Sequence, residues 1–148
     1  MSINGFREDV LRLAVIDGQG GGIGATIIKG IRQAIGQDVE ILALGTNSAA
    51  TTRMMKAGAN KGATGENAIV LTCQKVDLIV GPIGIIMANS MMGELTPAMA
   101  TAVTSCGAAK VILPLSQENV VLVGASDEPL PHLVEQAIKK IKEIHENV

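Results

Sequence analysis

Apolar residues in this chain fall into short continuous runs, separated by segments in which they recur at helical spacing. Continuous runs bounded by turn residues are typical of strands in a parallel sheet, because such strands are covered on both faces. The pattern predicts five strands, at Leu11–Ile16, Val39–Leu44, Val76–Gly81, Lys110–Leu115 and Asn119–Gly124.

Helical spacing is clearest after the first strand, where apolar side chains recur at Ile23, Ile27, Ile31 and Ile35, just before Gly36. An apolar stripe of this period predicts an amphipathic helix, and glycine commonly ends one. Four further helices are predicted over residues 47–56, 65–75, 96–106 and 127–145. Their expected N-terminal caps are Asn47 or Ser48, Thr64, Thr96 and Asp127.

The alternation of strands and helices predicts a three-layer αβα sandwich, a single Rossmann-like domain over residues 1–148. With strands counted along the chain, we expect a mostly parallel five-stranded sheet in the order 2-1-3-4-5. The order 3-2-1-4-5 is the alternative, and it needs a different placement of the third strand. Only Ser116–Glu118 separates the last two runs. Parallel strands need a crossover of about a dozen residues, so the fifth strand is expected to be antiparallel.

Composition and charge limit the class of function. The net charge is −2, and Phe6 is the only aromatic residue. Nucleic-acid binding needs a basic face, and single-strand binding also needs stacking rings, so we expect no nucleic-acid partner. Apolar residues make up 47% of the chain and charged residues 18%, which favours either burial between subunits or a sheet covered on both faces. We therefore expect a homo-oligomer.

The N-terminal sequence and the lengths of the apolar runs predict a cytoplasmic protein with no membrane span. The N-terminus has no basic start followed by an apolar core, so no signal peptide is expected. The most apolar window, Leu78–Gly93, is interrupted by Asn89 and Ser90 and is shorter than the roughly 20 residues that a transmembrane helix needs. Cys73 and Cys106 lack the spacing of metal ligands, so no metal site is predicted.

The strongest chemical signal is a glycine-rich segment between the first strand and the first helix. It reads Asp17-Gly-Gln-Gly-Gly-Gly-Ile-Gly24. Glycines let backbone N–H groups approach a phosphate closely, and the start of a helix favours negative charge. The alternative is a plain turn followed by a helix cap. Each glycine adds to the conformational entropy lost on folding, so a turn alone does not explain so many glycines. The predicted ligand-binding residues are Asp17, Gly18, Gln19, Gly20, Gly21, Gly22, Ile23 and Gly24.

Two registers of this loop suggest a dinucleotide. Gly20, Gly22 and Ala25 fit G-x-G-x-x-A, whereas Gly18, Gly22 and Gly24 fit G-x-x-x-G-x-G. The second register resembles the T-G-x-x-x-G-I-G loop of short-chain dehydrogenases. The Tyr-x-x-x-Lys pair of that family has no counterpart, because the chain contains no tyrosine. The resemblance therefore implies a cofactor loop without that dehydrogenase chemistry.

The end of the second strand bears on which nucleotide is bound. A dinucleotide site places an acidic residue for the ribose about 20 residues after the last glycine. Thr46 and Asn47 lie there instead. Asn47, Ser48, Thr52 or Arg53 can bind a 2′-phosphate, which favours NADP over NAD. The cofactor stays open, with NAD(P) or another nucleotide as candidates.

A second glycine cluster, Gly81-Pro82-Ile83-Gly84, follows the third predicted strand. In a 2-1-3 order it lies beside the first loop, where ligands bind in such sheets. A simple strand stop is the alternative. Glu66 is a candidate acid–base group or ribose ligand, or else a charge that suits a helix start. The methionine-rich segment after the cluster is expected to form a short helix or a lid. Its polar residues either line a pocket that this segment closes or form its solvent-facing side; they are Asn89, Ser90, Glu94 and Thr96.

Four segments together resemble a family of short bacterial proteins of unknown function with a Rossmann-like glycine-rich loop. They are Asp17–Gly24, Leu44-Gly-Thr-Asn-Ser-Ala-Ala-Thr51, Ala63-Thr-Gly-Glu-Asn-Ala-Ile69 and Gly81–Gly84. The resemblance implies a bacterial cytosolic protein and brings no activity.

We therefore expect a protein that binds a nucleotide or another phosphate-bearing small molecule at its glycine-rich loop. No residue is assigned a catalytic role. The alternative is a structural or regulatory homo-oligomer in which the loops serve only as turns.

Overall fold

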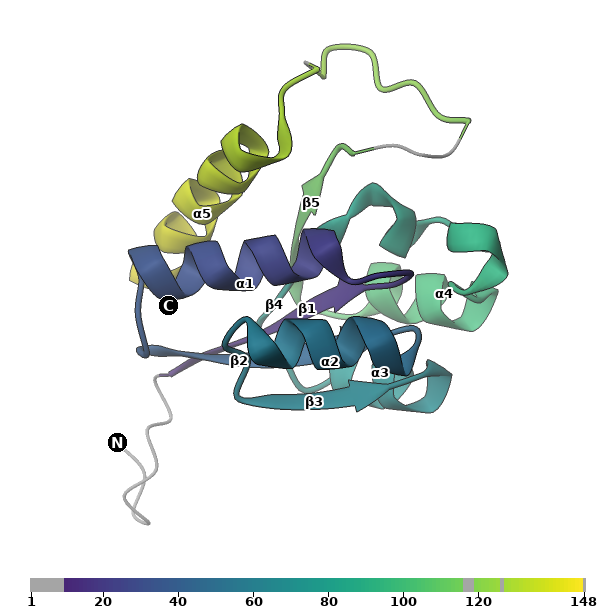
Figure 1. Cartoon of the computed structure of the whole chain (residues 1–148), viewed down its shortest axis with the longest axis horizontal. Coiled ribbons are helices and arrows are strands. Elements are labelled where there is room, and N and C mark those ends of the chain that lie inside the picture. Colours follow the sequence, from purple (N-terminus) through teal and green to yellow (C-terminus); the bar gives the residue numbers. More distant parts are fainter. Residues whose placement is uncertain (1–9, 116–118, 126, 148) are drawn as a thin grey trace.

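The computed structural model describes residues 10–115, 119–125 and 127–147. Five strands form one sheet in the order β3-β2-β1-β4-β5, and every neighbouring pair is parallel (Figure 1). The strands are β1 (Leu11–Asp17), β2 (Val39–Gly45), β3 (Lys61–Thr64), β4 (Leu78–Pro82) and β5 (Ala109–Leu113).

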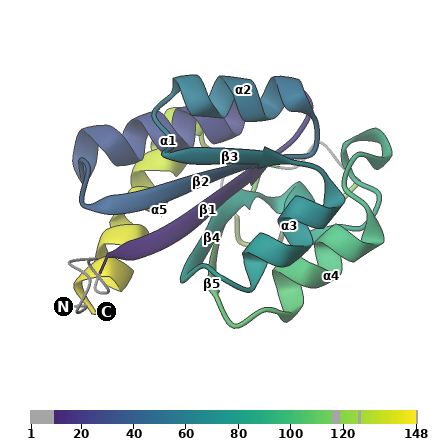
Figure 2. The same ribbon diagram turned by 90° about the horizontal axis from the view of Figure 1, so that it is seen from below.

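Helices cover both faces of the sheet (Figure 2). Alternate side chains of β1 enter two cores: Leu13 and Val15 pack under α1, α2 and α5, whereas Ala14 and Ile16 pack against α3 and α4. This confirms the predicted three-layer αβα arrangement. The helices are α1 (Gly22–Ala34), α2 (Ser48–Lys56), α3 (Glu66–Cys73), α4 (Pro97–Ser105) and α5 (Leu130–Glu146), with 3-10 turns η1 (Ile83–Ile86) and η2 (Met91–Gly93) between β4 and α4.

The predicted strand order is wrong, and so is the antiparallel last strand. Residues 119–124 are not in a strand, and Val121 and Val123 are 89% and 100% exposed. An apolar run indicates a buried strand only where the fold packs something against it, and none of the described core covers this one. The predicted turn at 116–118 lies outside the described residues. The four predicted strands that do form are neighbours as expected, in the order β2-β1-β4-β5.

The fifth strand is β3, which the pattern does not reveal. Its sequence Lys-Gly-Ala-Thr is short and largely exposed, because it is the edge strand beside β2. A side chain on Gly62 would lie 2.9 Å from Met55 Sδ, so α2 packs directly on the backbone of this strand. An edge strand made of small and polar residues has the composition of a loop. The last helix also differs, since it begins at Leu130 after Pro129 rather than at an Asp127 cap.

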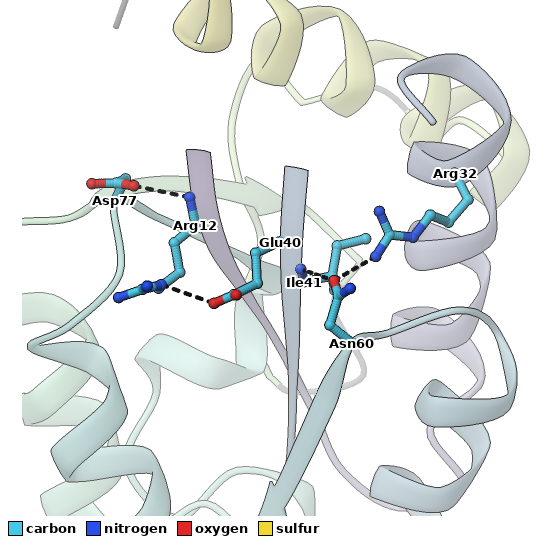
Figure 3. A network of polar contacts seen from close by, with 6 residues as sticks. All are labelled: Arg12, Arg32, Glu40, Ile41, Asn60 and Asp77. Atoms are coloured by element: carbon cyan, nitrogen blue, oxygen red, sulfur yellow. Dashed lines mark hydrogen bonds and ion pairs between the residues drawn. The ribbon is translucent and has the colours of Figure 1, made fainter. Parts of the chain in front are cut away.

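The amino ends of the strands are joined by polar contacts (Figure 3). Arg12 Nε lies 2.8 Å from Glu40 Oε1, and the Arg12 amide donates to Asp77 at 2.9 Å. Oδ1 of Asn60 accepts from the Ile41 amide at 2.7 Å and from Arg32 Nη2 at 2.6 Å. Intramolecular contacts thus occupy this end of the sheet, and the glycine loops lie at the opposite, carboxyl end.

In the described part of the chain, no helix combines the length and the apolar character needed to cross a membrane.

Candidate functional site

The Asp17 carboxyl group holds both ends of the glycine-rich loop. It is the last residue of β1 and is 4% exposed. Its Oδ1 accepts from the Gly18 amide at 2.8 Å, and its Oδ2 accepts from the Gly24 amide at 2.7 Å. Burial raises the pKa of this carboxyl, and the hydrogen bonds from the Gly24, Gly18 and Ile23 amides oppose that rise. Asp17 therefore serves α1 as a cap, a role that Gly21 at the N-cap position has no side chain to fill.

Three of the loop glycines are required by packing within the chain. A Cβ on Gly18 would collide with Thr46 Oγ1. Gly21 has a φ of +74°, and its Cβ would lie 2.7 Å from Ala50 Cα in α2. A Cβ on Gly24 would lie 2.5 Å from Met54 Sδ. The loop and the first turn of α1 thus pack directly onto β2 and α2.

The two other glycines face Arg53. The nearest atom to a Cβ on Gly20 is Arg53 Nη1 at 3.9 Å, and for Gly22 the same atom lies at 3.2 Å. Arg53 belongs to α2, is exposed, and reaches the Gly20 carbonyl with Nη1 at 3.5 Å. A cationic side chain therefore lies beside the least crowded part of the loop.

A cavity of about 240 Å³ opens beside the loop and joins both glycine clusters. It lies between the ends of β1 and β4, where the strand order switches direction and where ligands bind in open α/β sheets. Its lining comprises Asp17, Gly18, Gln19, Gly20, Gly21, Gly22, Ile23, Pro82, Gly84, Met91 and Leu115.

Two residues of the second predicted cluster lie outside this lining. Gly81 is required by close strand packing, because a Cβ there would lie 2.6 Å from the Ile16 carbonyl oxygen. Ile83 is 7% exposed and belongs to the buried apolar residues. Leu115, by contrast, lines the cavity, although the sequence marks it only as part of an apolar run.

Glu94 links the loop to the end of β2. Its Oε1 accepts from the Gln19 amide at 2.9 Å, from Thr46 Oγ1 at 2.6 Å and from Asn47 Nδ2 at 2.9 Å. The Thr46 hydrogen bond, followed by that of the Gln19 amide, lowers the pKa of the Glu94 carboxyl. The sequence marks Glu94 as a possible pocket residue but does not show its partners, which lie 47, 48 and 75 residues away.

The remaining predicted residues lie apart from the cavity. Asn47 Oδ1 caps α2 by accepting from the Ala50 amide at 2.8 Å. Ser48 lines a separate, open depression of about 360 Å³ with Ala49, Thr52, Arg53 and Lys56. Glu66 Oε1 accepts from the Thr96 hydroxyl at 2.6 Å. Among the described residues, no three His, Cys, Asp or Glu side chains are grouped to hold a metal ion.

The segment after β4 covers one side of the cavity. Met91 is 9% exposed and lines the cavity, whereas Met92 is 96% exposed. Asn89, Met91 and Met92 have φ values of 68°, 56° and 57°, a left-handed backbone that residues other than glycine adopt infrequently. Ser90, buried beneath this segment, donates to the Gly84 carbonyl. The predicted short helix or lid is thus a pair of 3-10 turns held against the second glycine cluster.

The fold and the cavity define a class, that of all-parallel α/β domains with a glycine-rich loop at the switch point of the sheet. Within it, the chain belongs to the family described as a domain of unknown function (DUF3842), whose model matches residues 12–146. This confirms the predicted resemblance to a family of unknown function. No curated protein sequence matches the chain significantly.

Solved structures resemble the chain at low identity. A dodecameric FMN-dependent Ubix-like decarboxylase from Escherichia coli O157:H7 is 12% identical with a TM-score of 0.48, over 89% of this chain and 94% of that one. A universal stress protein in complex with cAMP is 18% identical with a TM-score of 0.38, over 68% and 94%. A universal stress protein from Archaeoglobus fulgidus is 14% identical with a TM-score of 0.39, over 70% and 97%.

Proposed function

We propose that the protein binds the phosphate group of a small molecule in the cavity beside the glycine-rich loop. The observation that carries this proposal is Gly20. A Cβ there would approach only Arg53 Nη1, at 3.9 Å, and its φ lies outside the left-handed region. A glycine where alanine would fit lowers the stability of the fold by about 0.4–1 kcal/mol, so close approach of a ligand is the better reason for it.

The hydrogen bonds of the loop single out two donors for that phosphate. The Gly18 and Gly24 amides donate to Asp17, the Gln19 amide to Glu94, and the Gly21 amide to the Gly18 carbonyl. Within the described chain, the Gly20 and Gly22 amides have no such partner, and both residues line the cavity. Gly22 is the first residue of α1, where the helix dipole favours an anion, and Gly20 lies in the turn just before it.

Arg53, which lies beside Gly20 and Gly22 but outside the cavity lining, is the cation that we assign to this site. Asp17 and Glu94 are both bonded to loop amides, so the loop already holds two carboxyl groups close to an incoming phosphate. The guanidinium group beside Gly20 and Gly22 offsets that negative charge and offers several N–H donors to phosphate oxygens.

The size of the cavity favours a small ligand. Its volume of about 240 Å³ lies below the roughly 300–1,000 Å³ of pockets that enclose a drug-sized molecule. A phosphate with a small remainder, or one end of a mononucleotide, suits it better than NAD(P). The Asn47 side chain, expected to bind a 2′-phosphate, donates to Glu94 and to the Gln19 carbonyl and does not line the cavity. The bacterial source, the cytoplasmic location and the single-domain organisation stay predictions.

Thermal unfolding with and without ligand tests this function. We expect inorganic phosphate, AMP or FMN to raise the melting temperature of the wild-type protein, since a ligand that binds only the folded state stabilises it. Gly20→Ala should lose that increase, although the melting temperature of the free variant should be no lower than that of the free wild-type protein. Gly107→Ala, where a Cβ has no atom within 4 Å, is the matched control and should retain it. Equal increases in all three proteins would contradict the proposal.

A second observation favours the alternative of a homo-oligomer. Val121, Leu122 and Val123 are 89%, 39% and 100% exposed in the described stretch before α5. Three consecutive exposed apolar side chains are unfavourable in water, and contact with a second copy of the chain would bury them. We propose this contact as an assembly role that does not depend on the phosphate site.

A further inference from the structure

Three hydrogen-bond donors at the ends of β1 and β2 converge on one oxygen of the protein itself. Oε1 of Glu94 accepts from the Gln19 amide, the Thr46 hydroxyl and the Asn47 carboxamide, at 2.9, 2.6 and 2.9 Å. Convergent N–H and O–H donors are the means by which proteins hold phosphate and carboxylate oxygens. We call this donor set the second subsite.

The second subsite adjoins the proposed phosphate site along the backbone. Gln19 supplies a donor to one and Gly20 to the other, and consecutive Cα atoms lie about 3.8 Å apart. Gly18 packs against the same carboxylate, since a Cβ there would lie 3.0 Å from Glu94 Oε1. Two phosphoryl groups joined by a bridging oxygen suit donors on adjacent residues, whereas a single phosphate fills only one subsite.

The segment just before Glu94 has an unfavourable backbone conformation. Three residues just before it, Asn89, Met91 and Met92, have left-handed φ values, and Gly93 has a φ of 88°. Such a backbone persists only while the surrounding contacts hold it, and it is common where a segment clamps a ligand. The hydrogen bonds of Glu94 are among the contacts that hold this segment, in which Met92 is 96% exposed.

We propose, building on the proposed phosphate site, that the ligand carries a diphosphate group whose second phosphoryl group replaces the Glu94 carboxylate in the second subsite. Without ligand, Glu94 satisfies the three donors. A monophosphate in the first subsite leaves Glu94 in place. A diphosphate supplies a competing oxyanion tethered next to the same donors.

Calorimetric titration with inorganic phosphate and pyrophosphate tests this inference in the wild-type protein, Glu94→Ala and Glu94→Gln. Removal of the carboxylate in Glu94→Ala should raise pyrophosphate affinity about tenfold and phosphate affinity less than about twofold, since a vacated charge-assisted donor set is worth about tenfold. Glu94→Gln keeps an acceptor oxygen without the charge, so it should shift in the same direction by less. It also serves if the alanine variant does not fold.

Glu40→Gln is the control, because it removes one negative charge at the other end of the sheet, where Glu40 pairs with Arg12. It should leave both affinities unchanged. Equal gains for the two anions in the Glu94 variants, or no gain for pyrophosphate, would overturn the inference while phosphate binding by the wild-type protein still stands. Failure of every variant to bind either anion would overturn the proposed function as well.

Discussion

The carboxyl group of Asp17 accepts a hydrogen bond at 2.7 Å from the amide of Gly24, seven residues further along the chain. This contact, with the one from the Gly18 amide, ties the glycine-rich loop to the end of β1. Asp17 thus uses the Gly18 and Gly24 amides and leaves those of Gly20 and Gly22, which line the cavity, to the proposed ligand.

Asp17 makes the stability of the fold depend on pH. Burial raises the pKa of its carboxyl above the ordinary value of 3.8, so the folded state binds a proton more tightly than the unfolded state does. Its contribution to the free energy of unfolding is then fully present below the unfolded pKa and is lost as pH rises through the folded pKa. Urea unfolding should be measured for the wild-type protein and Asp17→Asn at several pH values from below 3.8 upward. The difference between their free energies of unfolding should shrink as pH rises.

The amide of Asp17→Asn turns an N–H group toward a backbone donor, so we expect that variant to be less stable by about 1–3 kcal/mol at acidic pH. Asp38→Asn, at an exposed position before β2, controls for the loss of a carboxyl group. A stability difference between wild type and Asp17→Asn that grows with pH would show that the Asp17 pKa is lowered by folding.

Arg32 should matter more to stability than Arg12, although both are arginines at the amino ends of the strands. Arg32 donates to the carbonyls of Gly58, Gly36 and Val39, and to Asn60. Its loss leaves the partly buried carbonyls of Gly36 and Val39 without a charged donor, so Arg32→Ala should lower the free energy of unfolding by about 2–3 kcal/mol. Arg12 is 51% exposed in its pair with Glu40, and Arg12→Ala should lower it by less than about 1 kcal/mol. Urea denaturation compares them, and equal losses would contradict this assignment.

Two adjacent glycines should respond differently to the same substitution. Gly21→Ala places a Cβ 2.7 Å from Ala50 Cα on a backbone with φ of +74°. Both effects are unfavourable, and we expect a loss of about 2–4 kcal/mol in the free energy of unfolding. Gly20→Ala has room, and we expect it to raise the free energy of unfolding by about 0.4–1 kcal/mol, because alanine has less conformational freedom than glycine in the unfolded chain. Chemical denaturation separates the two, and a comparable loss in Gly20→Ala would show that Gly20 is also a packing residue.

Val123 tests the proposed assembly. If a second copy covers this fully exposed side chain, the wild-type protein should sediment at a multiple of 15.3 kDa. Val123→Asp should shift the distribution toward the monomer, because a buried carboxylate without a partner is strongly unfavourable. Val121→Ser, at the neighbouring exposed position, should weaken assembly to a smaller extent. A wild-type protein that sediments as a monomer would rule out the assembly role.

Much of the fold was predictable because its central strands are apolar and its helices have a clear period. Leu11–Ile16 and Val39–Leu44 correspond closely to β1 and β2. The edge strand β3 could not be predicted, because Lys61 and Gly62 are exposed and show neither an apolar run nor an alternation of apolar and polar residues. The strand predicted at residues 119–124 is wrong because an apolar run in the sequence does not show whether another element covers it.

The site was predictable only in part. Its position followed from glycines at the ends of two neighbouring strands, since the carboxyl ends of parallel strands meet at one edge. The separate roles of the glycines could not be predicted, because Gly21 and Gly20 differ in backbone φ and in the atoms that lie opposite them, neither of which a run of glycines reveals. The contact of Glu94 with Gln19 joins residues 75 positions apart, and nothing local to either residue signals it.

The central claim is that a phosphate binds to the amides of Gly20 and Gly22 beside Arg53. The most direct measurement is a titration of the ¹⁵N-labelled protein with inorganic phosphate, followed by the amide signals of individual residues. We expect the Gly20 and Gly22 amides to shift in a saturable manner, while the amide of Gly107, distant in the sequence and outside the cavity lining, stays in place. Saturable shifts elsewhere with Gly20 and Gly22 unchanged, or no saturable shift at all, would contradict it.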